Sequence, residues 1–279
     1  MKIKISMDSA CDLRADVVEK HNIGVTRLTI ICGDEEFKDG AGFFPEDIFE
    51  RVEAGGVCTT AAISVGEYND YFTEWLRDCD ALIHFNLSSE ISVCYQNALL
   101  AVEGRPIHVI DSRSLSSGSG MLALTAAELA EQGLDADEIV EKVRELIPKV
   151  DVSFVIDTLK YLHRGGRCSA LQVLGANMLK LKPCIEVNEG SMGVGKKYRG
   201  SFDTVILQYV KDRLEGRDDI DYRRIFMSHP PGVSSETLSN VRKAILECGP
   251  FEDIQDTLAG CTISNHCGSP TLGVIYYKK

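Results

Sequence analysis

The first half of the chain alternates short apolar runs with segments of helical period, and this alternation is the strongest constraint on its fold. Strand-like apolar runs occur at residues 2–6, 25–31, 81–86 and 107–110. Segments of helical period lie between and after them, at residues 14–21, 45–53, 65–79, 92–103, 117–132 and 136–146. Because parallel strands need long crossover connections, usually helices, this order predicts an α/β fold with a mostly parallel N-terminal sheet and flanking helices.

The second half of the chain follows a different pattern. After a strand-like run at residues 153–156, residues 180–200 are typical of two antiparallel strands joined by a Gly-rich turn. Helical segments and strand-like runs then alternate, at residues 202–214, 224–227, 235–248, 251–255 and 273–277. We therefore expect an α+β C-terminal domain and place the boundary near residue 155, which gives domains of residues 1–155 and 156–279.

Composition narrows the classes of function. The 279 residues carry a net charge of -12, so a polyanion such as duplex nucleic acid would be repelled and is not an expected partner. Polar residues interrupt every apolar run before the ~20 residues of a membrane span, which predicts a cytoplasmic protein without stable membrane insertion. The ten cysteines are scattered and form no CxxC pair, so we expect reduced thiols, no metal and no cofactor.

Two glycine-rich segments look like phosphate-binding motifs but depart from them. Residues 190–197, GSMGVGKK, nearly match the nucleotide-binding loop GxxxxGK[ST], but Lys197 replaces the hydroxyl residue that would bind magnesium. A strand-like segment follows instead of a helix, so a β-hairpin turn is the better interpretation. Gly118, Gly120 and Ala123 match GxGxxA, but they lie well beyond the preceding strand. We expect the two glycines to permit either close packing or an unusual backbone conformation.

Polar residues follow three of the predicted parallel strands. They are Asp8-Ser9, Ser88-Ser89 with Ser92, and Asp111-Ser112. In open parallel sheets, ligands bind in the crevice at the carboxyl ends of the strands, where hydroxyls and helix N–H groups hold negative groups. This edge is therefore a predicted site for an anionic group, with Ser92 as the first candidate. The alternative for Ser92 is a simple N-cap of the helix that follows.

One histidine and two basic clusters are further candidates. His266 lies in a turn-rich loop before the last strand, where a side chain can be directed at a ligand. Most of the other histidines, which are His21, His84, His108, His163 and His229, are expected at surfaces or as caps of elements. Arg167 in HRGGR and Arg199 in KKYRG either balance nearby acidic side chains or place a guanidinium over the crevice, where it would bind a carboxylate or a phosphoryl group.

Short motifs along the whole chain have the order and spacing of a known family. They are Asp8-Ser9 with Cys11-Asp12-Leu13, Thr60 with Gly66-Glu67-Tyr68, Ser88-Ser89 through Ala98, Val109-Ile110-Asp111-Ser112, residues 157–162 with Gly165-Gly166-Arg167, Lys182-Pro183, Arg199-Gly200, and His266 with Gly268. In these motifs the chain resembles the DegV family of bacterial fatty-acid-binding proteins, which serve as the acyl-binding subunit of fatty acid kinase.

This resemblance implies a two-domain carrier that buries one long-chain fatty acid in a tunnel, with the fatty acid site at the domain interface. A partner fatty acid kinase subunit would phosphorylate the presented carboxylate, and the carrier itself would not be an enzyme. The positions that the resemblance assigns to the carboxylate are Thr60, Ser92, Val93 and Cys94. The positions that it assigns to the head group or to the kinase-facing surface are Arg167, Arg199 and His266.

The sequence departs from the family pattern near both carboxylate-binding segments. The family usually has T-S-Q-P-S where Thr60 is followed by AAIS, and Val93 replaces a glycine. The β-branched Val93 leaves open a different apolar ligand, such as a sterol or a prenyl acid. A competing hypothesis is an acyl hydrolase or transferase in which Ser92 or Cys94 is the nucleophile and His266 is the base.

Overall fold

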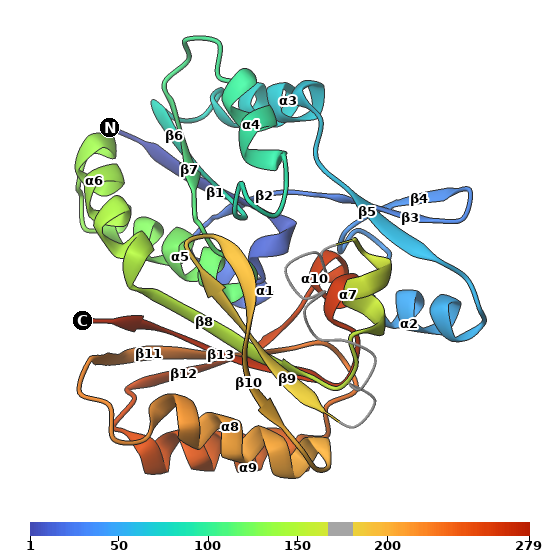
Figure 1. Cartoon of the computed structure of the whole chain (residues 1–279). Helices are drawn as coiled ribbons and strands as arrows, with labels where there is room; N and C mark the ends of the chain where they lie inside the picture. Colours follow the sequence, from blue (N-terminus) through green and yellow to red (C-terminus); the bar gives the residue numbers. More distant parts are fainter. Residues whose placement is uncertain (167–180) are drawn as a thin grey trace.

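A computed structural model describes residues 1–166 and 181–279, and three sheets organise this part of the chain (Figure 1). The N-terminal sheet has four parallel strands, in the order β2 (Gly24–Thr26), β1 (Ile3–Asp8), β6 (Ala81–Asn86) and β7 (Ile107–Asp111). Every residue of β6 is buried, as is usual for a central strand of a parallel sheet. This is the sheet that the alternating pattern predicts.

Helices cover both faces of the N-terminal sheet. They are α1 (Ala15–Lys20), α3 (Val65–Trp75), α4 (Cys94–Leu100), α5 (Ser117–Glu131) and α6 (Ala136–Leu146), with short 3-10 turns η1 (Ser9–Cys11) and η2 (Ile147–Lys149). α5 is apolar or small on nearly all sides because it lies between the N-terminal and C-terminal sheets. A Cβ atom at Gly120 would lie 2.1 Å from the carbonyl oxygen of Cys11, which confirms that this glycine permits close packing.

The C-terminal sheet has six strands. Their order is β10 (Ser191–Tyr198), β9 (Lys182–Asn188), β8 (Val150–Ile156), β13 (Thr271–Lys278), β11 (Ile220–His229) and β12 (Asp253–Leu258). All neighbouring pairs are antiparallel except β11 and β12, and α8 (Phe202–Leu214) and α9 (Ser235–Cys248) pack on the outer face. The predicted hairpin is present, but its turn is at residues 189–190, and most of the segment 190–197 that was expected to form the turn belongs to β10. β8 spans the predicted boundary near residue 155 and belongs wholly to this sheet.

A small third sheet projects beside the two larger ones (Figure 1). It consists of β4 (Glu35–Lys38), β3 (Thr29–Cys32) and β5 (Cys58–Ala61), and α2 (Pro45–Glu53) packs against it. The prediction of one strand at residues 25–31 was wrong, because the chain leaves the parallel sheet after β2 and starts β3 in the small sheet. Two short helices lie next to this sheet, α7 (Lys160–Arg164) and α10 (Cys261–Cys267).

Two cysteines correct the expectation of reduced thiols. Cys32 on β3 and Cys58 on β5 face each other in register, and their sulfur atoms are joined in a disulfide. Both side chains belong to the apolar core between the small sheet and α2. Scattered spacing in a sequence does not show which cysteines meet, and here strand pairing brings together two residues 26 positions apart.

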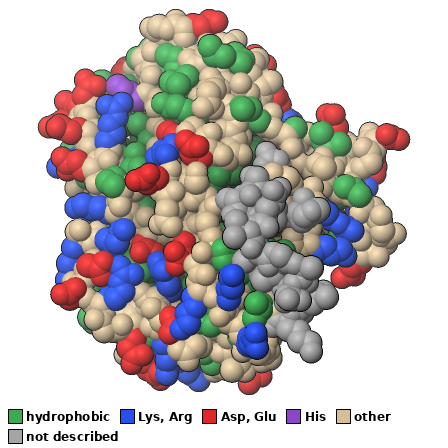
Figure 2. All heavy atoms as spheres, in the orientation of Figure 1, with side chains coloured by type: hydrophobic (Ala, Val, Ile, Leu, Met, Phe, Trp, Pro, Cys, Tyr) green, Lys and Arg blue, Asp and Glu red, His purple; other side chains and the backbone are tan. Residues whose placement is uncertain are grey.

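Acidic and basic side chains are interspersed over the face of the molecule in Figure 2. On the C-terminal half, Lys196 of β10 pairs with Asp212 of α8 at 2.5 Å, and Arg213 pairs with Glu186 at 2.8 Å. Arg199, in the same basic cluster as Lys196, is exposed. The pairing of Lys196 agrees with the interpretation that this cluster balances neighbouring acidic side chains.

Candidate functional site

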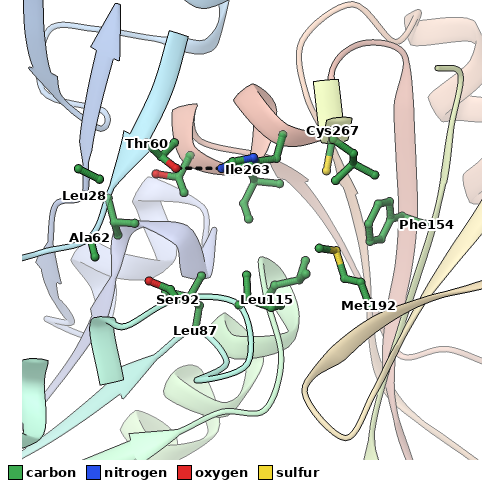
Figure 3. Close-up of a pocket in the computed structure, with 15 residues that line it drawn as sticks. Leu28, Thr60, Ala62, Leu87, Ser92, Leu115, Phe154, Met192, Ile263 and Cys267 are labelled. Atoms are coloured by element: carbon green, nitrogen blue, oxygen red, sulfur yellow. Dashed lines mark hydrogen bonds between the residues drawn. The ribbon is translucent and has the colours of Figure 1, made fainter. Parts of the chain in front are cut away.

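A pocket lies where the N-terminal half, the small sheet and the C-terminal sheet meet (Figure 3). Its wall is mostly apolar and is assembled from distant parts of the chain. Leu87 and Ile91 come from the loop after β6, Phe154 from β8, Met192 from β10 and Ile263 from α10. The fold therefore places an apolar cavity between its two halves.

Polar side chains of the lining lie on the side of the pocket opposite Phe154 and Met192 (Figure 3). Thr60 Oγ1 and His266 Nε2 form a hydrogen bond of 2.9 Å. Thr60 faces the pocket because side chains alternate along β5, and His266 shares the pocket-facing side of α10 with Ile263. The predicted turn-rich loop at His266 is thus a helix, and the helix directs this side chain.

Two buried carboxylates hold the start of α10. Asp39 accepts a hydrogen bond from the backbone N–H of Cys261 at 2.8 Å, and Asp12 accepts one from Gly260 at 2.8 Å. Such N–H groups have no partner inside the helix, so these carboxylates satisfy them. Burial raises the pKa of Asp12 to about 7, although the hydrogen bond from Gly260 acts in the opposite direction. The carboxylates fix the helix that carries His266.

Ser92 lies in a tight turn before α4. Its backbone N–H donates to the carbonyl of Ser88 at 3.1 Å, and its side-chain oxygen accepts from the N–H of Cys94 at 3.2 Å. The N-cap residue of α4 is Val93, and no side chain caps this helix, so Ser92 is not the N-cap that the alternative predicts. A hydroxyl that accepts from the N–H of Cys94 keeps its proton for donation, so this contact is compatible with ligand binding.

Val93 and Cys94 face away from the pocket. Each residue at the start of a helix is rotated by about 100° from the one before it, so Ser92 and its two successors point in different directions. The Val93 side chain is 58% exposed, whereas Cys94 is buried in the core beside α3. Burial raises the pKa of the Cys94 thiol to about 12, so little reactive thiolate forms at neutral pH.

The predicted arginines do not join the described lining. Arg167 lies outside the described residues, and Arg199 is exposed beyond the end of β10. Among residues 1–166 and 181–279, the pocket is lined by no lysine and no arginine. Of the predicted site residues, the structure brings together Thr60, Ser92 and His266.

His84 is an exception to the expectation that most of these histidines lie at surfaces or cap elements. It is fully buried, with Nδ1 at 2.8 Å from Ser6 Oγ and Nε2 at 3.3 Å from Asp8 Oδ1. Asp8 also accepts from the backbone N–H of Leu87 at 3.3 Å. Buried polar groups need hydrogen-bond partners, and this network supplies them. Its contact with the backbone of Leu87 fixes the start of the loop after β6, and Leu87 lines the pocket.

The pocket is narrow. Its volume is about 40 Å³. Pockets for ligands of drug size usually have roughly 300–1,000 Å³, so a long ligand requires the lining side chains to move apart. Flexible side chains such as Met192 suit this role, because an unbranched thioether adapts to irregular space.

The pocket combines hydroxyl and imidazole groups on one side with apolar side chains on the other. Within the described ranges, no cluster of three or more His, Cys, Asp or Glu side chains is placed to hold a metal ion. No helix found in the same ranges has the length and apolar character needed to cross a membrane. Fold and site together define an α/β protein with an apolar pocket between its halves, whose polar side chains gather on one side.

The chain belongs to the DegV family. Residues 2–279 match the family model described as "Uncharacterised protein, DegV family". A DegV domain-containing protein of Caldanaerobacter subterraneus subsp. tengcongensis is 34% identical, and the match covers 100% of this chain and 99% of the relative. Another, from Clostridium perfringens, is 30% identical with the same coverage. The family predicted from the motif order is confirmed.

Solved structures share the fold. A structure described as "Fatty Acid Binding of a DegV family Protein from Thermus thermophilus" has a TM-score of 0.89 and 28% identity, with 100% of both chains covered. The Streptococcus pneumoniae Fatty Acid Kinase (Fak) B3 protein loaded with linoleic acid has a TM-score of 0.86, also with 100% of both chains covered. At 22% identity, that second similarity shows the fold. The predicted fold class is confirmed.

Proposed function

We propose that this chain binds a long-chain fatty acid in a tunnel formed by widening of the pocket, and presents the carboxylate to a partner fatty acid kinase. The observation that carries the proposal is the meeting of Thr60, Ser92 and His266, from three separate segments, at the polar side of an apolar pocket. The similarity to a Thermus thermophilus DegV protein whose description states fatty acid binding supports it.

The binding free energy of a fatty acid is favourable only when its apolar tail is buried and its carboxylate is hydrogen-bonded. Burial of ~14 methylenes at ~0.8 kcal/mol each gives roughly 11 kcal/mol of gross stabilisation. Lost freedom on association offsets at least several kcal/mol of this. A buried carboxylate without partners adds a further cost, so hydrogen-bond donors at the polar side are required. In the proposal, Thr60, Ser92 and His266 supply them.

The role toward a kinase is the finer part of the proposal. The Fak B3 protein, which shares this fold, is named as a protein of fatty acid kinase. We extend that role to this chain: a carrier in the cytoplasm, without a cofactor or catalysis of its own, that leaves phosphoryl transfer to its partner. Arg199, exposed beside the C-terminal sheet, is then available to a partner surface.

Binding is tested with purified, delipidated protein. Solvent extraction and mass spectrometry before delipidation are expected to release a long-chain fatty acid, and titration after delipidation is expected to give one site per chain. Extracts without fatty acid, combined with no binding on titration, would overturn the proposal. Production of acyl phosphate only when ATP, kinase and the loaded chain are all present tests the kinase role.

A hydrolase or transferase remains the competing hypothesis. Two observations weigh against it: the high pKa of the Cys94 thiol, and the hydrogen bond that joins His266 Nε2 to Thr60 rather than to Ser92. Incubation with an activated acyl ester separates the two functions. A carrier binds stoichiometrically without turnover, whereas turnover that disappears in His266→Ala establishes the enzyme.

A further inference from the structure

We infer that Phe154 is a movable partition that determines how far an acyl chain reaches into the protein, and thereby selects ligand length. The inference rests on the proposed function. It concerns a second cavity behind the pocket, which none of the motifs in the sequence points to. The argument uses the position of that cavity, the neighbours of Phe154 and the direction in which a chain must enter.

A second cavity of about 20 Å³ adjoins the pocket. The two cavities share four lining residues, which are Leu115, Phe154, Ile263 and Cys267. These four side chains therefore lie at the boundary between the two cavities. Beyond them, the second cavity is bounded by Val152, Gly273 and Ile275 of the C-terminal sheet, so it offers further apolar space.

Phe154 is the largest of the four shared side chains and the one that lies opposite a glycine. Ile263 and Cys267 belong to α10, whose start is fixed by buried carboxylates. Phe154 has the largest side chain of the four, and its direct partner on β13 is Gly273. A Cβ atom at Gly273 would lie 2.7 Å from the carbonyl oxygen of Ser153 and 2.9 Å from the Cβ of Phe154, so the close approach of the two strands admits only glycine opposite Phe154.

The direction of entry follows from the polar side of the pocket. A carboxylate held near Thr60 and His266 lies across the pocket from Phe154 (Figure 3). The tail of the acid therefore meets the phenyl ring last. A short tail ends against the ring, and a longer one continues only when the ring moves out of the boundary between the two cavities.

The test compares saturated fatty acids of 12 to 18 carbons on delipidated wild type, Phe154→Ala, Phe154→Leu and Phe154→Trp. Each additional buried methylene tightens Kd about fourfold. In Phe154→Ala, the preference for octadecanoic over dodecanoic acid is expected to rise at least about tenfold over wild type, because the enlarged space admits further methylenes. In Phe154→Leu, the preference for the longer acid is expected to rise by a smaller factor. In Phe154→Trp, it is expected to fall below that of wild type.

Phe44→Ala is the matched control, because it removes the same phenyl ring from an exposed residue that lines neither cavity. Its chain-length preference is expected to stay within about threefold of wild type, less than the effect of one methylene. Thermal melting shows whether Phe154→Ala is folded. If it is not, the chain-length preferences of Phe154→Leu and Phe154→Trp test the partition instead. Unchanged preference in the folded variants overturns the partition while binding itself persists. Absence of binding by wild type overturns the proposed function, and the partition with it.

Discussion

The hydroxyl of Thr60 reaches the pocket because successive side chains on a strand point to opposite faces. Thr59 is exposed, whereas Thr60 is half-buried and bonded to His266. Thr60→Val keeps the β-branched shape and removes the hydroxyl. A hydrogen bond to a charged group contributes ~1.5–3 kcal/mol, so we expect fatty acid affinity to fall roughly 10- to 100-fold, as measured by calorimetric titration.

Thr59→Val provides the control for this change. It is the same substitution one residue away, on the exposed face of β5, and is expected to leave affinity unchanged. The ligand-free Thr60→Val protein should melt within a few degrees of wild type. An affinity equal to that of wild type would show that Thr60 does not hold the carboxylate, and a large loss of ligand-free stability would make its role structural.

At the level of single residues, the sequence alone predicts the polar part of the site and not its apolar wall. Thr60 and His266 are 206 positions apart, so no local pattern connects them, and the family resemblance was needed to put them in one site. The apolar wall was not singled out. Phe154 and Met192 look like ordinary strand residues, because alternation shows that a side chain is buried but not whether it faces a core or a cavity.

The disulfide stabilises the small sheet as an element. Cys32 and Cys58 close a segment that contains β4 and α2, with a sequence separation of 26. By loop-closure entropy, a link of this span is expected to add roughly 3–4 kcal/mol to the free energy of unfolding. The double variant Cys32→Ser/Cys58→Ser should therefore unfold at lower denaturant concentration than oxidised wild type.

Reduction separates the disulfide from the effect of the substitutions. A reductant is expected to lower the melting temperature of wild type and to leave that of the double variant unchanged. Thiol titration of denatured wild type should count more thiols after reduction than before it. Equal counts would show that the two cysteines are not linked.

The buried carboxyl of Asp12 at the start of α10 predicts that the free energy of unfolding depends on pH. The pKa of Asp12 is about 7 in the fold, above the ordinary value of 3.8, because the carboxyl is buried. Between these two values, the folded chain holds a proton that the unfolded chain has lost. The stability from this group is therefore complete below about pH 4 and decreases by roughly 1.4 kcal/mol per pH unit until about pH 7.

Asp12→Asn is expected to remove this slope, since an amide does not ionise and still accepts from Gly260. Denaturant unfolding at several pH values from 4 to 8 measures how the free energy of unfolding changes with pH. Asp16→Asn is the matched control, because the Asp16 side chain is 64% exposed, and it should keep the wild-type decrease over this range. An identical slope in Asp12→Asn and wild type would assign the pH dependence to other groups.

Elements were predictable where they are long and periodic. α5 and α8 span close to their predicted ranges, as do the strands of the parallel sheet except β2. The small sheet was missed because each of its strands has four residues and because β5 pairs with β3 across a long segment that contains α2. α10 was missed because its sequence, CTISNHC, has low intrinsic helix propensity, and buried carboxylates at its start compensate.

At the scale of the whole molecule, the β9–β10 hairpin joins the two halves. The Ser88 hydroxyl donates to the carbonyl of Gly190 at 2.7 Å, and the Arg113 guanidinium donates to the carbonyl of Glu189. A Cβ at Gly190 would lie 2.5 Å from Ser88 Oγ, so the turn of the hairpin is tightly seated. Because β10 carries Met192, these contacts hold one wall of the pocket in place.

Opening the narrow pocket for a fatty acid must loosen these contacts, so they are expected to control the rate of exchange. In Arg113→Ala, we expect fatty acid to dissociate several-fold faster in a displacement experiment. Stability should change by less than about 1 kcal/mol, because the Arg113 side chain is 35% exposed and solvent screens its interactions. Arg105→Ala is the control, since Arg105 bonds to Asn69 and Thr73 within the N-terminal half. If fatty acid dissociates from Arg113→Ala at the wild-type rate, or equally fast from Arg105→Ala and Arg113→Ala, the pocket opens without releasing the hairpin.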